Sequence, residues 1–321
     1  MTGELTVTEV GPEAAETMVA IVHAAFGARP VLDPPATALD ETADTVRAAL
    51  SEGGGLLASL DGRPVGSVLL VPGPDALLLR RVAVLPDAQH HGVAHAMAAH
   101  AEQLARERGL DRVECLARAE LPGTVRFWTS QGYVEVAHDG TSLTMVKELP
   151  VVIPVPTADD MRALGHRLAG LLRAGDVVVL TGELGAGKTT LTQGLGEGLG
   201  VRGGITSPTF VISRIHPSLG AGPALVHVDA YRLGGLAELD DLDLDVSVEE
   251  SVTVVEWGEG LAEALSEDRL EVAVTRATGE DAGSGAVETR RVRLRPVGRR
   301  WAASGVAAYV LGGEPAVGPV A

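Results

Sequence analysis

The first half of the chain alternates between two hydrophobic patterns. Apolar runs, several with a two-residue period, predict strands; they are LTVTEV (Leu5–Val10), LLASLDG, PVGSVLLV, ALLLRRVAVL, RVECLARA, YVEVAHD and SLTMVKEL. Stretches with the period of a helix lie between them, at Ala14–Phe26, Leu39–Leu50, His91–Arg108 and Thr124–Ser130. Asp61, Gly62 and Arg63 separate the second and third runs and predict the turn of a hairpin.

The second half begins with a helical pattern and then becomes rich in apolar, β-branched runs. The run DVVVLTG predicts a buried parallel strand. Helices are expected at Ala158–Arg173 and Lys188–Leu199. Further strands are expected at Thr209–Ile215, Ala224–Asp229, Ser251–Glu256, Arg269–Thr275 and Thr289–Arg295.

A proline-containing segment, Glu148–Asp160, separates the two halves and is the predicted domain boundary. A length of 321 residues is typical of two domains, each able to bury its own core. We therefore predict an α/β fold with domains at residues 1–150 and 151–300. Residues 301–321 are rich in Ala, Gly, Val and Pro, which predicts a poorly ordered tail.

Composition narrows the class of protein. The chain is 45% hydrophobic and 21% charged, which is typical of a globular protein. A net charge of −17 argues against a broad basic face, so contact with RNA is expected only indirectly, through partner proteins, or at a small local patch. The single cysteine, Cys115, excludes an internal disulfide and is expected in the core. Without a run of about 20 apolar residues or a signal segment, we expect a soluble, cytoplasmic protein with no membrane contact.

The segment TGELGAGKTT carries the strongest chemical signal. It satisfies G-x-x-x-x-G-K-[ST], and a strand precedes it while a helix follows. Glycines let backbone N–H groups converge on phosphate, and the helix start adds positive charge. The residues predicted to bind ATP are Gly182, Glu183, Leu184, Gly185, Ala186, Gly187, Lys188, Thr189 and Thr190. Lys188 is expected to reach the β- and γ-phosphates, and Thr189 to ligate Mg²⁺. Only two of the 26 basic residues are lysines, which indicates that an ammonium is required here.

A magnesium nucleotide also needs a carboxylate at the end of a neighbouring buried strand. VHVDAYR ends a strand at Asp229, and VTVVEWGE ends one at Glu256. The second run is the more apolar, as expected of a central strand. Glu256 is therefore the predicted metal ligand, and Asp229 is expected to orient water or the metal's hydration shell. Each carboxylate alone is equally consistent with capping a loop.

Four motifs in series resemble the TsaE (YjeE) family across about Val155–Arg295. They are GELGAGKTT, SPTF (Ser207–Phe210), HVDAYRL (His227–Leu233) and VVEWGE (Val254–Glu259). Members of that family are the ATPase component of bacterial tRNA threonylcarbamoyladenosine synthesis. The resemblance implies that ATP turnover resets a complex containing the carbamoyl-transferring partner TsaD and its companion TsaB.

The resemblance also assigns roles to residues. It implies that Thr209 belongs to a switch-like loop that senses the nucleotide, and that Asp229 is needed for activity. It implies that Thr189 and Glu256 hold Mg²⁺. Trp257 is implied to lie close to the nucleotide, with core packing as the alternative.

Several features of this half leave alternatives open. Arg214 and Arg232 are candidates for an arginine finger, although surface solvation explains either. The acidic run Glu238–Asp245 is either a solvated loop or a docking surface for a basic partner. The phosphate loop alone also fits a small-molecule kinase, but no arginine-rich lid segment follows Lys188.

The first half contains a second candidate anion site. In Arg80–Gly109 a strand, a short loop and a helix follow one another, and the loop reads Gln89-His-His-Gly92-Val93-Ala94. Small residues at a helix start allow backbone N–H groups to approach a pyrophosphate. With FWTSQGYVEV and the strand order, this loop resembles the GNAT N-acetyltransferase family. The resemblance implies acetyl-CoA as ligand, with pantetheine along the strand edge at Val82 and Val84 and pyrophosphate on Gln89, Gly92, Val93 and Ala94.

This half departs from the GNAT pattern where a general acid is expected. Trp128 stands where the family often has a tyrosine, and Leu121 where an asparagine is common. Neither can protonate a leaving thiolate. Glu114 or Glu120 could act as base, or each could be a strand-end or surface carboxylate. His90 and His91 are expected to be exposed loop residues. The first domain is therefore either an acetyltransferase or a non-catalytic docking or CoA-sensing module.

Overall fold

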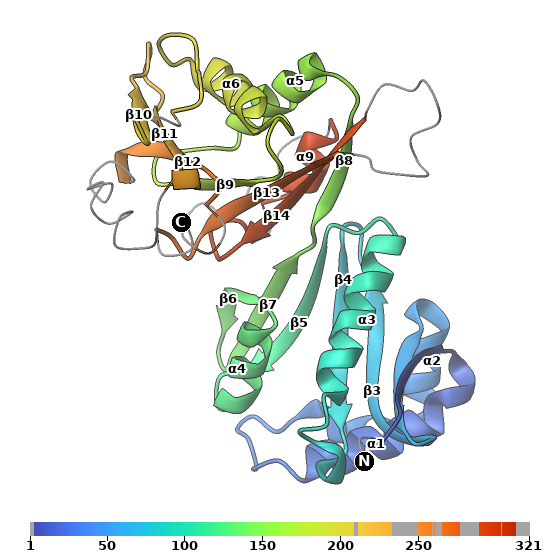
Figure 1. The fold of residues 1–321 in the computed structure, drawn as a ribbon. Coiled ribbons are helices and arrows are strands. Elements are labelled where there is room, and N and C mark those ends of the chain that lie inside the picture. Colours follow the sequence, from blue (N-terminus) through green and yellow to red (C-terminus); the bar gives the residue numbers. More distant parts are fainter. Residues whose placement is uncertain are drawn as a thin grey trace, which may run out of the picture. The chain divides into compact units, whose positions relative to one another are not determined.

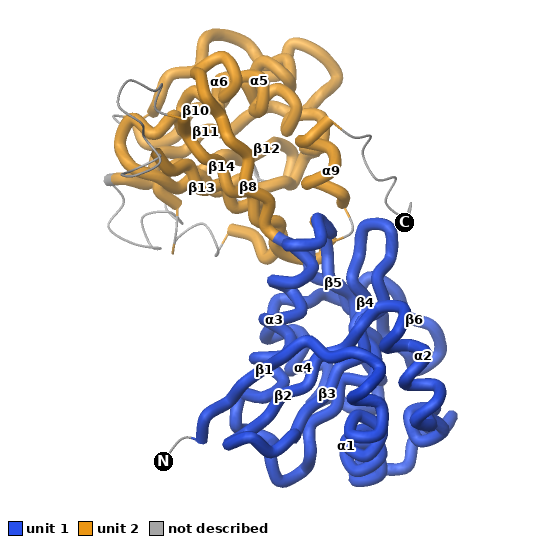
Figure 2. Tube along the Cα trace, turned by 90° about the vertical axis from the view of Figure 1, so that its right-hand side faces the viewer, with its two compact units in different colours: residues 1–149 blue, residues 150–321 orange. Residues whose placement is uncertain are grey.

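The computed structural model describes residues 3–208, 211–232, 249–258, 260, 265–276, 289–302 and 304–312. The chain divides into two compact units, residues 1–149 and 150–321 (Figure 2). Each unit is built on one mixed sheet of seven strands. Among the described residues, no helix is long and apolar enough to cross a bilayer.

The first unit has the strand order β1-β2-β3-β4-β5-β7-β6; Figure 1 labels β3 to β7. Its strands are β1 (Leu5–Val10), β2 (Gly55–Leu60), β3 (Arg63–Pro72), β4 (Ala76–Val84), β5 (Arg112–Arg118), β6 (Val134–Asp139) and β7 (Ser142–Glu148). Its α-helices are α1 (Ala15–Gly27), α2 (Ala43–Gly53), α3 (Val93–Glu107) and α4 (Pro122–Ser130). Short 3₁₀ turns are η1 (Pro12–Ala14), η2 (Thr37–Asp40) and η3 (Pro86–Ala88). The strands and helices predicted for residues 1–150 are thus present, with ends shifted by a few residues.

Helices cover both faces of the first sheet because successive strand residues point to opposite sides. Leu70 of β3 packs in the core that contains Met97 of α3. Its neighbour Leu69 packs in a separate core with Met18 of α1 and Leu50 of α2. Helix α3 therefore covers one face, and α1 with α2 covers the other.

The centre of the first sheet is split. Strand β4 pairs in parallel with β5 only over Ala76–Leu79, and its remaining residues, Arg80–Val84, have no ladder partner in β5. The ladder between β3 and β4 also shifts register between Ser67 and Leu69. Arg81 has a left-handed φ of 54° at this irregularity. A β-bulge re-aims a strand, so β4 leaves β5 and exposes a backbone edge.

The second unit has the strand order β10-β11-β12-β9-β13-β14-β8. Its strands are β8 (Val151–Val155), β9 (Val177–Thr181), β10 (Ser213–His216), β11 (Ala224–Asp229), β12 (Ser251–Glu256), β13 (Arg269–Arg276) and β14 (Arg290–Val297). Its helices are α5 (Ala158–Ala169), α6 (Lys188–Leu199) and α9 (Val306–Val310), with the turn η4 (Ala230–Arg232). Strands β11, β12, β9 and β13 run parallel, so their carboxyl ends meet at one edge, where a ligand site is expected.

Strand β9 is buried on both faces, as its apolar run predicts. Val178 and Leu180 pack in the core with α5 and α6. Val177 and Val179 pack in a second core on the opposite face. The strand therefore holds the segment that follows it in a fixed position.

The predicted boundary segment Glu148–Asp160 contains the division between the two units. It also contains β8, whose Pro154 is tolerated because β8 is an edge strand. Two predictions in this half are wrong in part. The strand expected from Thr209 begins only at Ser213, because the amides of Val211 and Ile212 bond back to the carbonyl of Pro208 in a turn. Residues 209 and 210 lie outside the described residues.

The prediction of a poorly ordered tail is the second. Trp301, Val306 and Val310 are buried in the core of the second unit, and the Arg300 guanidinium binds both carboxylate oxygens of Asp176 at 3.0 Å. A helix of five residues is too short to show a period in the sequence. Residues 313–321 lie outside the described residues.

Candidate functional site

The phosphate loop connects β9 to α6, as predicted. Gly187 is the N-cap of α6 and has a φ of 116°. Gly182 has a φ of 140°, and a Cβ there would lie 2.3 Å from the carbonyl oxygen of Val274. Glycine is required at both positions for conformational and steric reasons. The loop therefore has the backbone form that directs N–H groups toward an anion.

Lys188 is buried at the start of α6, with 5% of its surface exposed. Its ammonium donates hydrogen bonds to the carbonyl oxygens of Gly182 at 2.7 Å and Glu183 at 3.1 Å. Burial lowers the pKa of Lys188, and the negative charges of Glu256 and Asp229 oppose that shift. The positive charge of Lys188 thus lies inside the loop, where a bound phosphate would stabilise it.

The two predicted carboxylates lie side by side. Asp229 and Glu256 are register partners at the ends of β11 and β12, and each is 3% exposed. The Thr189 hydroxyl donates to Glu256 Oε1 at 2.9 Å. His227 Nε2 lies 3.0 Å from the same oxygen. The structure therefore joins Thr189 and Glu256, which are 67 positions apart in the sequence.

Asp229 is held by groups from two segments. Ser207 Oγ donates to its Oδ2 at 2.9 Å, and the amide of Tyr231 donates to its Oδ1 at 3.1 Å. Ser207 belongs to the SPTF motif, so this motif contacts the carboxylate edge. Thr209 of the same motif lies outside the described residues.

Trp257 lies over the lysine of the loop. The Lys188 ammonium is 3.8 Å from the centre of its ring, a cation–π contact. Trp257 has a left-handed φ of 61°, and its amide bonds to the carbonyl of Leu180. The Tyr231 ring lies 5.2 Å from the Trp257 ring. Trp257 is thus part of the loop's surroundings and only partly buried.

The structure also shows contacts that the sequence reasoning missed. His227 contacts Glu256, and its position two residues before Asp229, on the same strand face, was a usable signal. Two arginines of the β13–β14 pair bond to loop carbonyls: Arg276 to Leu184 at 3.1 Å and Arg290 to Ala186 at 2.9 Å. These arginines lie 92 and 104 positions after the loop residues that they contact, so no local pattern in the sequence indicates the contacts.

Arg214, one of the two candidate arginine fingers, is exposed on β10 and donates to Thr206 Oγ1 at 3.3 Å. Arg232, the other candidate, ends η4. The acidic run Glu238–Asp245 lies outside the described residues.

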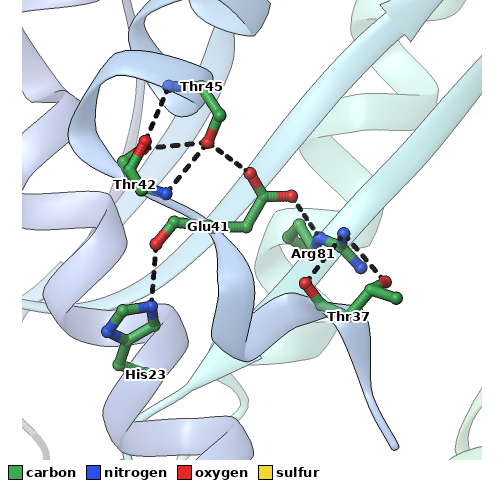
Figure 3. A network of polar contacts seen from close by, with 6 residues as sticks. All are labelled: His23, Thr37, Glu41, Thr42, Thr45 and Arg81. Atoms are coloured by element: carbon green, nitrogen blue, oxygen red, sulfur yellow. Dashed lines mark hydrogen bonds and ion pairs between the residues drawn. The ribbon is translucent and has the colours of Figure 1, made fainter. Parts of the chain in front are cut away.

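In the first unit, the predicted pantetheine edge is the unpaired part of β4. Val82 and Val84 are half-buried there, beyond the point where β5 diverges. A network fixes this part of the strand (Figure 3). Arg81 donates to Glu41 at 2.7 Å and to the Thr37 hydroxyl at 3.2 Å. The Glu41 carboxylate accepts a further bond from Thr45.

This network has an electrostatic consequence for Glu41. Burial alone would raise the pKa of Glu41, but hydrogen bonds from Thr45 and Arg81 and the charge of Arg81 lower it overall. His23 Nε2 lies 3.0 Å from the Glu41 carbonyl oxygen. The ionised carboxylate therefore links α2 to the bulge in β4, and the backbone carbonyl of the same residue contacts α1.

The predicted pyrophosphate loop precedes α3. Gly92 is the N-cap of α3 with a φ of 76°, and Gln89 is exposed. Ala94 is half-buried, and Val93 packs in the core, so only the backbone of Val93 is available to a ligand. These residues lie together at the start of one helix, the place where backbone N–H groups are unpaired.

The catalytic candidates of the first unit have other partners. Trp128 is 3% exposed and packs edge-on against Phe127 and Tyr133. Glu114 pairs with Arg112 at 2.7 Å. Their side chains therefore serve packing and ion pairing.

The remaining candidates behave similarly. Glu120 pairs with Arg118, whose hydrogen bond lowers the pKa of Glu120. Leu121 caps α4. His90 and His91 are exposed, as expected. Cys115 is buried, as expected, and burial raises the pKa of its thiol.

Comparison with known families yields one match in each unit. The model of the family described as threonylcarbamoyl adenosine biosynthesis protein TsaE matches residues 155–284. The model of the acetyltransferase (GNAT) family matches residues 21–133.

The chain has relatives named TsaE in several bacteria. The tRNA threonylcarbamoyladenosine biosynthesis protein TsaE of Streptomyces coelicolor is 67% identical over 147 residues, which is 46% of this chain and 97% of that protein. The protein of the same name from Mycobacterium bovis is 52% identical over 134 residues, covering 40% of this chain and 80% of that protein.

Two solved structures are similar to parts of the chain. YdiB of Bacillus subtilis is 29% identical, covers 50% of this chain and 94% of its own, and gives a TM-score of 0.37. The PaiA N-acetyltransferase of Thermoplasma acidophilum, solved with coenzyme A, is 14% identical, covers 45% and 99%, and gives a TM-score of 0.41.

Proposed function

The chain belongs to the TsaE family of threonylcarbamoyl adenosine biosynthesis proteins, and we propose that its second unit binds and hydrolyses ATP with Mg²⁺ in that process. The observation that carries the proposal is the 2.9 Å hydrogen bond from Thr189 to Glu256. It brings a strand-end carboxylate to the hydroxyl that follows the loop lysine. This is the side-chain pair that a magnesium nucleotide requires.

The residues at this position fit magnesium. The Thr189 hydroxyl and the Glu256 carboxylate offer oxygen ligands, which Mg²⁺ prefers. Mg²⁺ usually takes only one or two protein carboxylates and completes its shell with phosphate oxygens and water. When bound, it neutralises charge on the β- and γ-phosphates.

The chain's own residues would act by positioning and charge. The amides of the glycine loop and the Lys188 ammonium would bind the phosphate oxygens, and Lys188 would exchange its carbonyl partners for phosphate. Asp229, held by Ser207 and the Tyr231 amide, would orient the attacking water. Trp257 would lie beside the nucleotide because its ring covers Lys188, and Thr209 is proposed to sense it.

The biological partners follow from the family. We propose that TsaD-like and TsaB-like proteins bind this chain and that ATP turnover resets their complex. The net charge of −17 supports indirect contact with tRNA, because phosphate backbones bind basic surfaces. We propose a cytoplasmic location, where tRNA and these partners are found.

For the first unit we propose acetyl-CoA binding along Val82 and Val84 and at Gln89–Ala94. The unpaired β4 edge and the positive φ of Gly92 support this assignment. Acetyl transfer has less support, because Trp128 is buried and Glu114 is paired with an arginine. A docking or CoA-sensing module is therefore the second candidate for this unit.

Complementation tests the ATPase proposal. In cells depleted of their own TsaE, the wild-type chain is expected to restore threonylcarbamoyladenosine, measured by mass spectrometry of digested tRNA. Lys188→Ala is expected to restore none, whereas Lys147→Ala, at the only other lysine of the chain, restores it fully. Full rescue by Lys188→Ala at equal expression would refute the mechanism.

Titration tests the first unit. Acetyl-CoA added to the full-length chain is expected to bind with a Kd in the low-micromolar range, or about −8 kcal/mol. A panel of amines then separates the two candidates, since only an acetyltransferase releases free CoA with an acceptor present. Absence of binding would leave a docking module as the function of this unit.

A further inference from the structure

Two arginines lie directly opposite each other where β13 ends and β14 begins. Arg276 and Arg290 are ladder partners, and both side chains reach the phosphate loop. Like charges directly opposite each other destabilise a strand pair. Among the described residues, no carboxylate forms an ion pair with either guanidinium. The position therefore carries an electrostatic cost that a purely structural hairpin would not need.

The contacts to the loop suggest what this arrangement does. Arg276 Nη2 donates to the carbonyl of Leu184, and Arg290 Nε donates to the carbonyl of Ala186. In a planar trans peptide, the carbonyl and the following N–H point in opposite directions. Fixing these two carbonyls toward the arginines therefore fixes the N–H groups of Gly185 and Gly187 on the other side of the loop.

The fit between arginine and loop is close. A Cβ at Gly185 would lie 2.8 Å from Arg276 Nη2. Within the described part of the chain, Arg276 Nε is buried and has no hydrogen-bond partner. One donor of this guanidinium is thus shielded from water and unused, a costly condition in the absence of a compensating anion.

We propose that Arg276 and Arg290 are positioning residues of the nucleotide site, which orient the Gly185 and Gly187 amides toward phosphate and place two positive charges on the opposite side of the loop. This inference rests on the proposed ATP site and adds a second source of cations to Lys188. It gives the β13–β14 pair a role in recognising the polyphosphate part of a nucleoside triphosphate. Arg290 acts from beyond residue 284, where the TsaE family match ends.

Titration of the full-length chain tests the inference, with MgATP and inorganic tripolyphosphate as probes. Arg276→Met and Arg290→Met are each expected to raise the Kd for both probes about tenfold, the value of one hydrogen bond to a charged group. Arg276→Lys and Arg290→Lys keep the positive charge but lose the planar guanidinium with its several donors. A smaller rise in Kd than in the Met variants is therefore expected. Arg293→Met is the matched control, because Arg293 is exposed on the same strand.

A second readout separates positioning from general destabilisation. The amide resonances of Gly185 and Gly187 in the unliganded chain are expected to shift in the Met variants and to stay in place in Arg293→Met. Unchanged Kd values and unchanged resonances in Arg276→Met and Arg290→Met would overturn the inference while leaving the ATP site intact. Failure of the wild-type chain to bind either probe would instead refute the ATP site, and the inference with it.

Discussion

The two units use the same backbone device in very different surroundings. Each places a glycine of positive φ before a helix: Gly92 before α3 and Gly187 before α6. Around Gly187, the Thr189 hydroxyl contacts the Glu256 carboxylate of β12, and the Lys188 ammonium is buried in the loop. In the first unit, the buried Trp128 stands where a catalytic acid is expected, and the candidate bases Glu114 and Glu120 are paired with arginines.

This difference separates binding from chemistry. A helix that begins after a glycine can bind phosphate through the backbone N–H groups of its first turn, which do not depend on particular side chains. Chemistry additionally needs side chains whose charge is available at the ligand. By this criterion the proposed ATP site of the second unit has side chains suited to chemistry, whereas the proposed acetyl-CoA site of the first unit has main-chain groups suited to binding.

The largest effect is expected when the proposed magnesium ligand of the second unit, Glu256, loses its charge. Glu256→Gln keeps the size of the side chain but removes its charge, so Mg²⁺-dependent ATP hydrolysis should fall by about a thousandfold, equivalent to about 4 kcal/mol. Glu197→Gln, at an exposed position of α6, should hydrolyse ATP at the wild-type rate. Equal rates for the two variants across a magnesium titration would remove Glu256 from the metal site.

The next effect concerns the end of the second unit. Arg300→Met leaves the buried Asp176 carboxylate without its ion pair, and burial already raises the pKa of Asp176 against the opposing influence of Arg300. Loss of one partner should lower the free energy of unfolding by about 3 kcal/mol. Arg299→Met, at an exposed neighbour, should change it little. Denaturation that gives the same midpoint for both variants would contradict a structural role for the tail.

A smaller effect distinguishes acetyl-CoA binding from ATP binding. Gly92→Asp should raise the Kd for acetyl-CoA about tenfold or more, because a carboxylate at the start of α3 repels pyrophosphate. The Kd for ATP should stay unchanged. Gly109→Asp is a matched control, since Gly109 also has a positive φ and open space around its Cα. If Gly92→Asp weakens ATP binding as well, the two sites are not independent.

The smallest effect is a pH dependence. Burial lowers the pKa of His216, a hydrogen bond with the Arg202 backbone opposes that shift, and nearby His227 and Arg214 add to it. Below the unfolded pKa of about 6.5, the unfolded chain therefore binds more protons, and stability falls as pH drops from 7 toward 5. His216→Gln should lose less stability over this window, by less than the about 1.4 kcal/mol of one full pKa unit. Parallel stability curves for the two proteins would show that His216 contributes nothing.

Much of the second site is predictable from local sequence. Lys188 and Thr189 follow a glycine loop between a buried strand and a helix. Asp229 and Glu256 end apolar strands, and parallel strands bring their carboxyl ends to one edge. These are short-range patterns combined with one general rule of sheet architecture, so the residues can be identified before their distances are known.

The remaining features depend on register and packing. Arg276 and Arg290 reach the loop only because β13 pairs with both β9 and β14. Pro154 argues against a strand in the sequence, yet it lies in the edge strand β8. Trp301 belongs to the core although the sequence around it is rich in alanine and glycine. Glu114 and Glu120 each pair with the arginine two residues before it, a contact that side-chain conformation decides. A single sequence gives no measure of which of these contacts form.

Calorimetric titration of MgATP into the full-length wild-type chain and Lys188→Ala is the most direct test of the central claim. The account predicts one ATP bound per wild-type chain and no measurable binding by Lys188→Ala, while Lys147→Ala binds like the wild type. Wild-type affinity in Lys188→Ala would contradict the assignment of the loop as the phosphate site.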